Sequence, residues 1–193
     1  MLRRSDEHDY SSKCFYLVTL TVEGRRPLLG RVTGKGDAPD DSAEAPRVEL
    51  SPLGQAVAQE WTNISLKFPQ VAIIAQQVMP DHFHGILYFR ESTDFHLGRI
   101  IRGFKTGTTR AYKELHPSFV DPSSLAATQS QHTEKAATSY PEKAPSHRTP
   151  TGLLWSHGYN DRILHTYHVL ETWKNYLHDN PRRFLIRHEH PDF

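Results

Sequence analysis

The stretch that most constrains the fold is residues 71–89, "VAIIAQQVMPDHFHGILYF". Two runs rich in β-branched and aromatic residues flank Pro80-Asp81, a dipeptide typical of turns. The pattern predicts strands over 71–79 and 82–89, paired as an antiparallel hairpin. A two-stranded hairpin is only marginally stable alone, so other elements must cover its apolar face. Side chains alternate along a strand, which puts on one face of the second strand His82, His84, Ile86 and Tyr88.

The remaining elements complete a mixed fold. "CFYLVTLTV" (14–22) indicates a strand, and 51–68 a helix that starts with Ser51 as N-cap and Pro52 at its first position. Residues 94–115 are helical with a basic face, 153–164 become strand-like in their second half, and 167–180 form a helix that Pro181 ends. The first six elements match the ferredoxin-like order, so we expect an α+β fold. Its antiparallel sheet carries helices on one face, and the last helix is an addition.

The whole chain, 1–193, is expected to be a single domain with two irregular segments. The first is a flexible loop at about 31–46 within a stretch rich in Gly, Pro and Asp. The second is a low-complexity insertion at about 117–150, with five prolines and ten Ser or Thr residues. Such a composition does not bury enough apolar surface to order itself.

Composition excludes several classes of protein. Cys14 is the only cysteine, so neither an internal disulfide nor a cysteine-based zinc site can form. No apolar run is long enough to cross a bilayer and the N-terminus lacks a secretory signal, so we expect a cytoplasmic protein without a membrane partner. The net charge of +1 is too small to indicate nucleic-acid binding by itself. The 13 histidines matter only through their arrangement.

The pair His82 and His84 would lie on the open side of the sheet if helices cover the other face. Two imidazoles at this spacing can hold one divalent cation with the help of a third protein group. The alternative is that they only form hydrogen bonds beside the hairpin. Among carboxylates, Asp81 is adjacent but would point to the opposite face if the strand already began there.

In the last helix, Tyr176 and Asn180 are four residues apart and therefore share a helix face. A tyrosine hydroxyl beside a divalent cation is a nucleophile suited to phosphodiesters, and an amide oxygen can complete the metal's ligands. The alternative is a tyrosine at the rim of an amphipathic helix followed by an Asn-Pro stop signal.

Together these motifs resemble a known family. "MPDHFHGI", "LGRIIRGFK", "LWSHGYNDRIL" and "YLHDNPRRF" occur in the order found in single-tyrosine HUH transposases, and Tyr176 follows His84 by 92 residues. Within that family the chain is most similar to the REP-associated tyrosine transposases and IS200-like relatives. The resemblance runs from about residue 14 to 187 and leaves out the segments 31–46 and 117–150.

The resemblance implies a role for each motif residue. His82 and His84 would be paired metal ligands, with Asn180 as third ligand, for Mg²⁺ or Mn²⁺. Two imidazoles fit Mn²⁺ better than Mg²⁺. Tyr176 would attack a phosphate of single-stranded DNA, leaving a 5′-phosphotyrosine and a free 3′-hydroxyl, so that rejoining is the reverse attack. Relatives recognise hairpins beside the cleavage point, so single-stranded or hairpin DNA is the expected partner; a homodimer and a monomer both remain open.

Other residues compete for or assist these roles. Tyr167 and Tyr159 are alternative nucleophiles, but Tyr176 alone has the Asn-Pro spacing. We expect DNA contacts from basic residues of the 94–115 helix and of the tail, namely Arg99, Arg102, Lys105, Arg182 and Arg183.

Three functions therefore remain: a metal-dependent tyrosine transposase or nickase, a catalytically silent hairpin-DNA-binding protein, and a His-metal hydrolase that uses an activated water. The hydrolase lacks an obvious carboxylate base.

Overall fold

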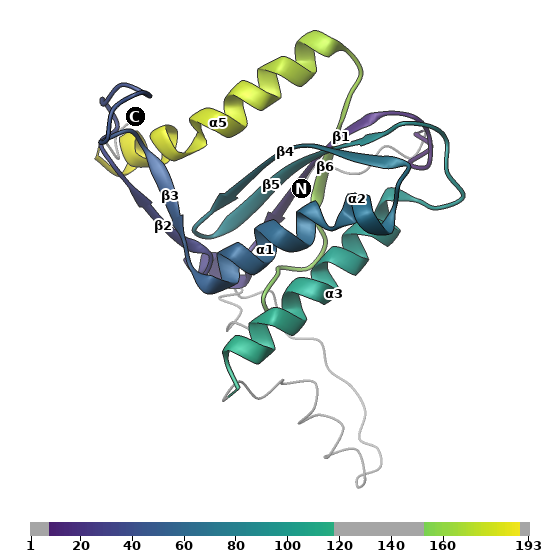
Figure 1. The fold of residues 1–193 in the computed structure, drawn as a ribbon, viewed down its shortest axis with the longest axis horizontal. Helices are drawn as coiled ribbons and strands as arrows, with labels where there is room; N and C mark the ends of the chain where they lie inside the picture. The colour runs from purple at the N-terminus through teal and green to yellow at the C-terminus, as the bar shows by residue number, and fades with distance from the viewer. Residues whose placement is uncertain (1–7, 118–152, 190–193) are drawn as a thin grey trace, which may run out of the picture.

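A computed structural model describes residues 8–117 and 153–189 and contains a four-stranded antiparallel sheet (Figure 1). The strands lie in the order β4-β5-β1-β6, which is the ferredoxin-like order, so the predicted fold class is confirmed. Every neighbouring pair is antiparallel. The strands are β1 (Phe15–Thr21), β4 (Val71–Met79), β5 (His82–Phe89) and β6 (Asn160–Leu164).

One face of this sheet is covered by the helices that connect its strands (Figure 1). These are α1 (Pro52–Thr62), the short α2 (Ile64–Lys67) and α3 (Leu97–Leu115). Ser51 caps α1 as predicted, since its hydroxyl accepts a hydrogen bond from the Gly54 amide at 3.0 Å. The core beneath them is aromatic: the Trp61 ring lies 4.8 Å from Phe83 and 5.2 Å from Phe104, centroid to centroid.

Gly85 of β5 is required by this aromatic packing. A Cβ atom at position 85 would lie 2.2 Å from Cζ2 of Trp61, well inside van der Waals contact. The absence of a side chain lets the indole approach the backbone of the strand closely. Adjacent residues of β5 therefore face opposite sides of the sheet: Gly85 faces the aromatic core, and His84 faces α5.

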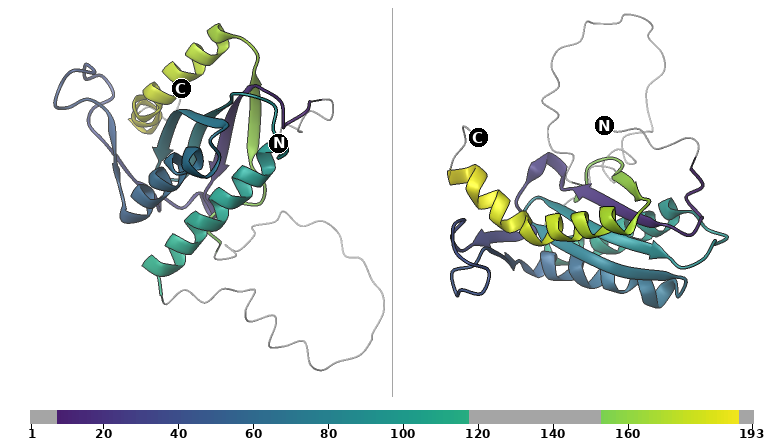
Figure 2. Two further views of the ribbon diagram at one scale, coloured as in Figure 1. Left: turned by 45° about the vertical axis from the view of Figure 1, so that its right-hand side comes forward. Right: turned by 90° about the horizontal axis from the view of Figure 1, so that it is seen from above.

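The opposite face of the sheet is covered by the last helix, α5 (Tyr167–Glu189), as both views of Figure 2 show. It packs on a smaller aliphatic cluster whose buried members are Leu17, Ile86, Leu164, Leu170 and Leu177. The prediction that Pro181 ends this helix is wrong, because α5 continues to Glu189 with Pro181 inside it. Proline removes one backbone hydrogen bond and crowds the preceding turn, which bends a helix without necessarily ending it. The yellow end of α5 turns out of line with its green part (Figure 2).

A separate two-stranded sheet holds the end of α5. The 3₁₀ turn η1 (Glu23–Arg25) leads from β1 to β2 (Gly30–Thr33), which pairs with β3 (Arg47–Leu50). The connection between these strands reaches α5, where the Arg182 guanidinium donates to the Gly36 carbonyl and to the Asp40 carboxylate, each at 2.5 Å. Most of the predicted insertion at 117–150 lies outside the described residues. No helix within 8–117 and 153–189 is long and apolar enough to span a membrane.

Candidate active site

One cavity of about 400 Å³, between the start of β5 and α5, is lined by His82, His84, Tyr176 and Asn180. The remaining lining comes from β1, η1, the turn before β5 and the end of α5, namely Thr19, Thr21, Arg25, Asp81, Arg183, Phe184, Arg187 and His188. Four residues that the sequence places in two motifs almost a hundred positions apart are thus brought together. The reason is that α5 crosses the sheet face to which the even-numbered residues of β5 point.

Both histidines have one ring nitrogen engaged by a neighbour. His82 Nδ1 lies 2.6 Å from Asp81 Oδ1, and His84 Nδ1 lies 2.8 Å from the hydroxyl of Thr19, its partner in β1. The two rings are 4.9 Å apart between centroids. Histidine ligands of metals usually have their second nitrogen held in this way, which fixes the ring and leaves Nε2 for the metal.

His84 is buried, with 8% of its surface exposed. The expectation that the histidines lie on an open sheet face is therefore wrong for His84, because α5 covers that face. Burial, with a smaller effect from the nearby His82 and Arg25, lowers the pKa of His84 to about 3. The imidazole is consequently neutral at physiological pH, which is the form that can bind a cation.

Asp81 lines the same cavity as the histidines. It would point to the opposite face only if the strand began there, but β5 begins at His82 and Asp81 belongs to the turn before it. Strand alternation does not govern a turn residue. Burial acts to raise the pKa of Asp81, but hydrogen bonds from His82 and Arg25 outweigh it and lower the pKa below its usual range. Its carboxylate is therefore ionised and orients His82.

On α5, Tyr176 and Asn180 face the histidines from successive turns. The Tyr176 ring lies 6.0 Å from that of His84, centroid to centroid, and the Arg183 guanidinium carbon lies 5.2 Å from the Tyr176 ring centroid. Asn180 is 7% exposed, and its Nδ2 atom is buried without a hydrogen-bond partner among the described residues. An orphaned buried donor costs about 1–3 kcal/mol, so this amide is expected to meet a further group when the site is in use.

The donor set fits a divalent cation only if Asn180 takes part. No group of three or more His, Cys, Asp or Glu side chains suited to a metal exists in the described part of the chain. Two imidazole Nε2 atoms and one amide oxygen form an incomplete ligand shell that leaves positions for substrate. The O and N atoms of the amide exchange places on rotation about χ2. Asn180 can therefore offer its oxygen to a cation or donate its amide N–H to a phosphate oxygen.

The competing tyrosines lie elsewhere. Tyr167 begins α5 and is 75% exposed outside the cavity. Tyr159 lines a different cavity, next to α3 on the other side of the sheet. Of the three tyrosines considered, only Tyr176 faces the histidines.

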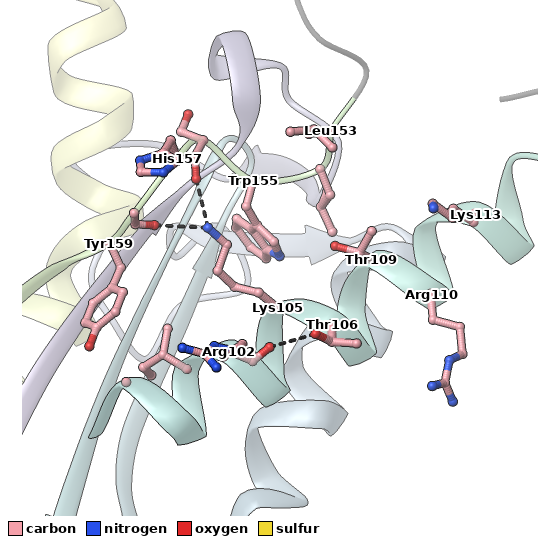
Figure 3. A pocket seen from close by; sticks show the side chains of 15 residues that line it. Arg102, Lys105, Thr106, Thr109, Arg110, Lys113, Leu153, Trp155, His157 and Tyr159 are labelled. Carbon is pink, nitrogen blue, oxygen red and sulfur yellow. Dashed lines mark hydrogen bonds between the residues drawn. The ribbon is translucent and has the colours of Figure 1, made fainter. Parts of the chain in front are cut away.

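The five predicted DNA-binding residues are divided among three places. Arg183 lines the histidine cavity, whereas Arg182 is engaged by the 34–46 connection. Arg99 and Arg102 are exposed on α3, on the opposite side of the sheet. Lys105 is half-buried, and its Nζ atom donates to the carbonyls of Ser156 at 2.9 Å and Gly158 at 3.1 Å. Figure 3 shows this lysine reaching from α3 to the 156–158 backbone.

Comparisons with known proteins place the fold. No family model matches the chain. An uncharacterized protein of Haemophilus influenzae is 29% identical over 126 residues, which are 55% of this chain and 64% of that protein, so the match spans less than two thirds of the relative. A solved structure of a REP-associated tyrosine transposase bound to a REP hairpin superposes with a TM-score of 0.54 at 13% identity, covering 95% of this chain and 74% of that one. At this identity the likeness is one of fold.

Proposed function

We propose that this protein is a metal-dependent, single-stranded DNA endonuclease or transposase of the HUH type, with Tyr176 as nucleophile. The observation that carries the proposal is the single cavity shared by two histidines, a tyrosine and a buried asparagine. The fold of the transposase structure supports the same class of activity. Hairpin DNA as a partner is part of the proposal, because the neighbour's own structure contains a hairpin.

In the proposed reaction, the Tyr176 oxygen attacks the phosphorus of a DNA phosphodiester. A bond forms between that oxygen and phosphorus, the bond to the 3′ oxygen breaks, and the phenolic proton is lost while the leaving 3′ oxygen gains one. The product is a 5′-phosphotyrosine and a free 3′-hydroxyl, and the reverse attack rejoins DNA. No nucleotide cofactor is needed, since one phosphodiester replaces another.

The residues of the cavity supply positioning and charge. His82 and His84 would hold the cation through Nε2, with Asn180 as third ligand, and their Nδ1 contacts to Asp81 and Thr19 keep both rings oriented. When bound, Mg²⁺ or Mn²⁺ would polarise the phosphate and stabilise the charge that develops on it. Arg183, whose guanidinium lies beside the Tyr176 ring, would contact a non-bridging phosphate oxygen.

A His-metal hydrolase is the second candidate, favoured by the carboxylate of Asp81 in the cavity. That carboxylate already contacts His82 and the Arg25 guanidinium, the latter at 3.2 Å, which leaves it poorly placed as a general base. A silent DNA-binding protein is the third candidate and would retain the same fold.

Covalent capture separates the three candidates. The full-length protein is incubated with Mn²⁺ and a labelled pool of single-stranded DNA, including hairpin-bearing strands, and analysed on denaturing gels. We expect a protein–DNA adduct that is abolished by EDTA and by Tyr176→Phe.

Tyr167→Phe is the matched control, because it removes a hydroxyl from the same helix outside the cavity. It should form the adduct normally. Cleavage without an adduct, retained in Tyr176→Phe, would instead establish the hydrolase, and DNA binding with neither product would establish the silent protein.

A further inference from the structure

Arg25 has a backbone conformation that arginine seldom adopts. It ends the η1 turn with a φ angle of 54°, in the left-handed region, and no other non-glycine residue within 8–117 and 153–189 has a positive φ. Gly24, just before it, has a φ of 67°, which a glycine adopts without steric cost. At Arg25 the Cβ atom makes the same region unfavourable. Strained backbone of this kind is concentrated at functional sites, so the role of the Arg25 side chain needs an explanation.

The side chain of Arg25 is not needed to hold the turn in place. The backbone already joins the turn to the start of β5, since the Val22 amide donates to the Asp81 carbonyl at 2.8 Å. The neighbouring Arg26 supplies a side-chain contact, because its guanidinium donates to the Leu153 carbonyl at 2.6 Å. Both contacts would remain if the Arg25 guanidinium were removed.

The Arg25 guanidinium lines the histidine cavity and is only partly used by the protein. Its Nη1 atom donates to Asp81 Oδ2 at 3.2 Å, which is its only hydrogen bond or ion pair with the described part of the chain. A guanidinium has five N–H donors, so four are left for a ligand. The side chain is 67% exposed, which leaves these donors accessible. A planar, charged donor group of this kind favours an anion with two or more oxygens.

The cavity as a whole has an excess of positive charge. Arg183 and Arg187 line it from α5, whereas Arg25 lines it from the turn after β1. Among the described residues of the lining, Asp81 is the only aspartate or glutamate, and its carboxylate already contacts Arg25 and His82. Three guanidinium groups therefore stand against one carboxylate. This charge favours an anionic ligand that contacts both elements at once.

We propose that Arg25 is a phosphate-binding residue of the active site, which contacts the DNA backbone from the turn after β1 while Arg183 contacts it from α5. The inference rests on the proposed function for the identity of the substrate. One N–H of Arg25 keeps the Asp81 carboxylate, and the others donate to non-bridging phosphate oxygens. Donors from two separate elements fix the orientation of the phosphate toward Tyr176 more firmly than Arg183 alone. The strained backbone is retained because the side chain must extend from the turn into the cavity.

The alternative is that Arg25 only neutralises Asp81. An ion pair with an arginine this exposed contributes little to stability, so it gives little reason to keep a strained backbone. The two roles predict different results for Arg25→Asn, because asparagine tolerates the left-handed region and carries no charge.

The test compares the wild type, Arg25→Asn and the control Arg31→Gln, which removes an exposed arginine that pairs with Glu49 outside the cavity. Anisotropy in EDTA measures binding of a fluorescein-labelled oligo-dT of about 20 nucleotides. Denaturing gels measure the rate of adduct formation with Mn²⁺ and the single-stranded DNA pool. We expect Arg25→Asn to bind roughly 10-fold more weakly, with a salt slope smaller by about 0.7, and to form the adduct roughly 10- to 100-fold more slowly. The control should match the wild type in both.

Thermal unfolding separates phosphate binding from a structural role. Arg25→Asn should unfold within about 2 °C of the wild type or at a higher temperature, because it loses only an exposed ion pair and relieves strain. A clearly lower unfolding temperature would overturn the inference in favour of the structural role.

Two readouts keep this inference apart from the proposed function. Unchanged DNA binding by Arg25→Asn would exclude Arg25 as a phosphate ligand, whether or not the wild type forms the adduct. If the wild type forms no adduct but Arg25→Asn still weakens binding, the proposed function fails and the phosphate contact of Arg25 stands. A wild type that binds no DNA would overturn both.

Discussion

The two faces of the four-stranded sheet differ in the size and polarity of the groups packed against them. The face under α1 and α3 is closed by interlocking aromatic rings around Trp61, and its buried polar groups are few, among them the Thr108 hydroxyl and the Trp61 indole N–H. The face under α5 has a small aliphatic cluster at one end and a polar cavity at the other. His84 and Gly85 are adjacent in β5, yet one faces the polar cavity and the other faces Trp61. The comparison indicates that the first face contributes most of the stability. On the second face, buried polar groups such as His84 and Asn180 lower the stability and form the candidate site.

The largest expected effect follows from the aromatic face. Trp61→Ala should reduce the free energy of unfolding by about 3–5 kcal/mol, because it empties the space between α1, β5 and α3. Leu177→Ala on the α5 face should cost less, about 2–3 kcal/mol, since Leu177 is smaller than Trp61 and belongs to the smaller cluster. Urea denaturation followed by circular dichroism measures both. Equal losses would contradict the division between the faces.

The next largest expected effect is a loss of stability in acid, which arises on the α5 face of the sheet. The pKa of His84 is about 3 in the folded protein, lowered chiefly by burial, against about 6.5 when unfolded. Between these values the unfolded chain binds one more proton, so stability falls as the pH decreases below about 6.5. In EDTA, the wild type should lose roughly 2 kcal/mol more than His84→Gln between pH 7 and pH 4.5.

The control for this acid effect is His178→Gln, which replaces an exposed histidine of α5. It should lose stability in acid as the wild type does. Identical acid sensitivity of His84→Gln and the wild type would show that His84 is not a buried neutral group.

A smaller effect is expected at Asn180, whose amide donor is buried without a partner. Asn180→Leu should leave the metal-free protein equally stable or up to about 1 kcal/mol more stable, because an unsatisfied donor is removed. The same variant should lose the stabilisation that Mn²⁺ gives the wild type in thermal unfolding. Asn175→Leu, on the exposed side of α5, should retain the Mn²⁺ effect. A full Mn²⁺ response in Asn180→Leu would exclude Asn180 as a ligand.

An effect of similar size concerns the contact between α5 and the β2–β3 hairpin. Arg182→Ala should cost about 1 kcal/mol, because the Gly36 carbonyl loses a charged donor while the Asp40 carboxylate, largely exposed, contributes little. Amide hydrogen exchange in 30–50 should accelerate in Arg182→Ala and not in Arg183→Ala. Unchanged exchange together with weaker DNA binding would return Arg182 to its predicted role as a DNA contact.

Much of this architecture could be predicted from sequence because it depends on local patterns. The alternation of 71–79 and 82–89 predicted both strands, and Ser51-Pro52 predicted the start of α1. The spacing of Tyr176 and Asn180 predicted that they share one helix face. It did not predict which face of the sheet this helix covers. An amphipathic helix reveals that it buries a face but not against which surface, so the burial of His84 under α5 had no local signal.

The other differences have similar causes. Pro181 is a helix-ending signal when it acts alone, but here the helix is held on both sides of it, by Leu177 in the aliphatic cluster and by Arg182 on the hairpin. The orientation of Asp81 depended on whether the strand begins at 81 or 82, and the sequence does not fix a strand boundary to one residue. Lys105 and Arg182 were expected to contact DNA, and nothing in the sequence indicates the backbone carbonyls to which they donate.

The most direct test of the central claim identifies the residue that becomes attached to DNA. The adduct formed with Mn²⁺ is digested with nuclease and trypsin, and the modified peptide is sequenced by mass spectrometry. Trypsin separates the candidates, because Tyr176 lies in the peptide 175–182 and Tyr167 in 163–174. The account predicts a nucleotide phosphate on Tyr176 alone. Attachment to Tyr167 or Tyr159 would contradict it, because neither lines the cavity that contains His82 and His84.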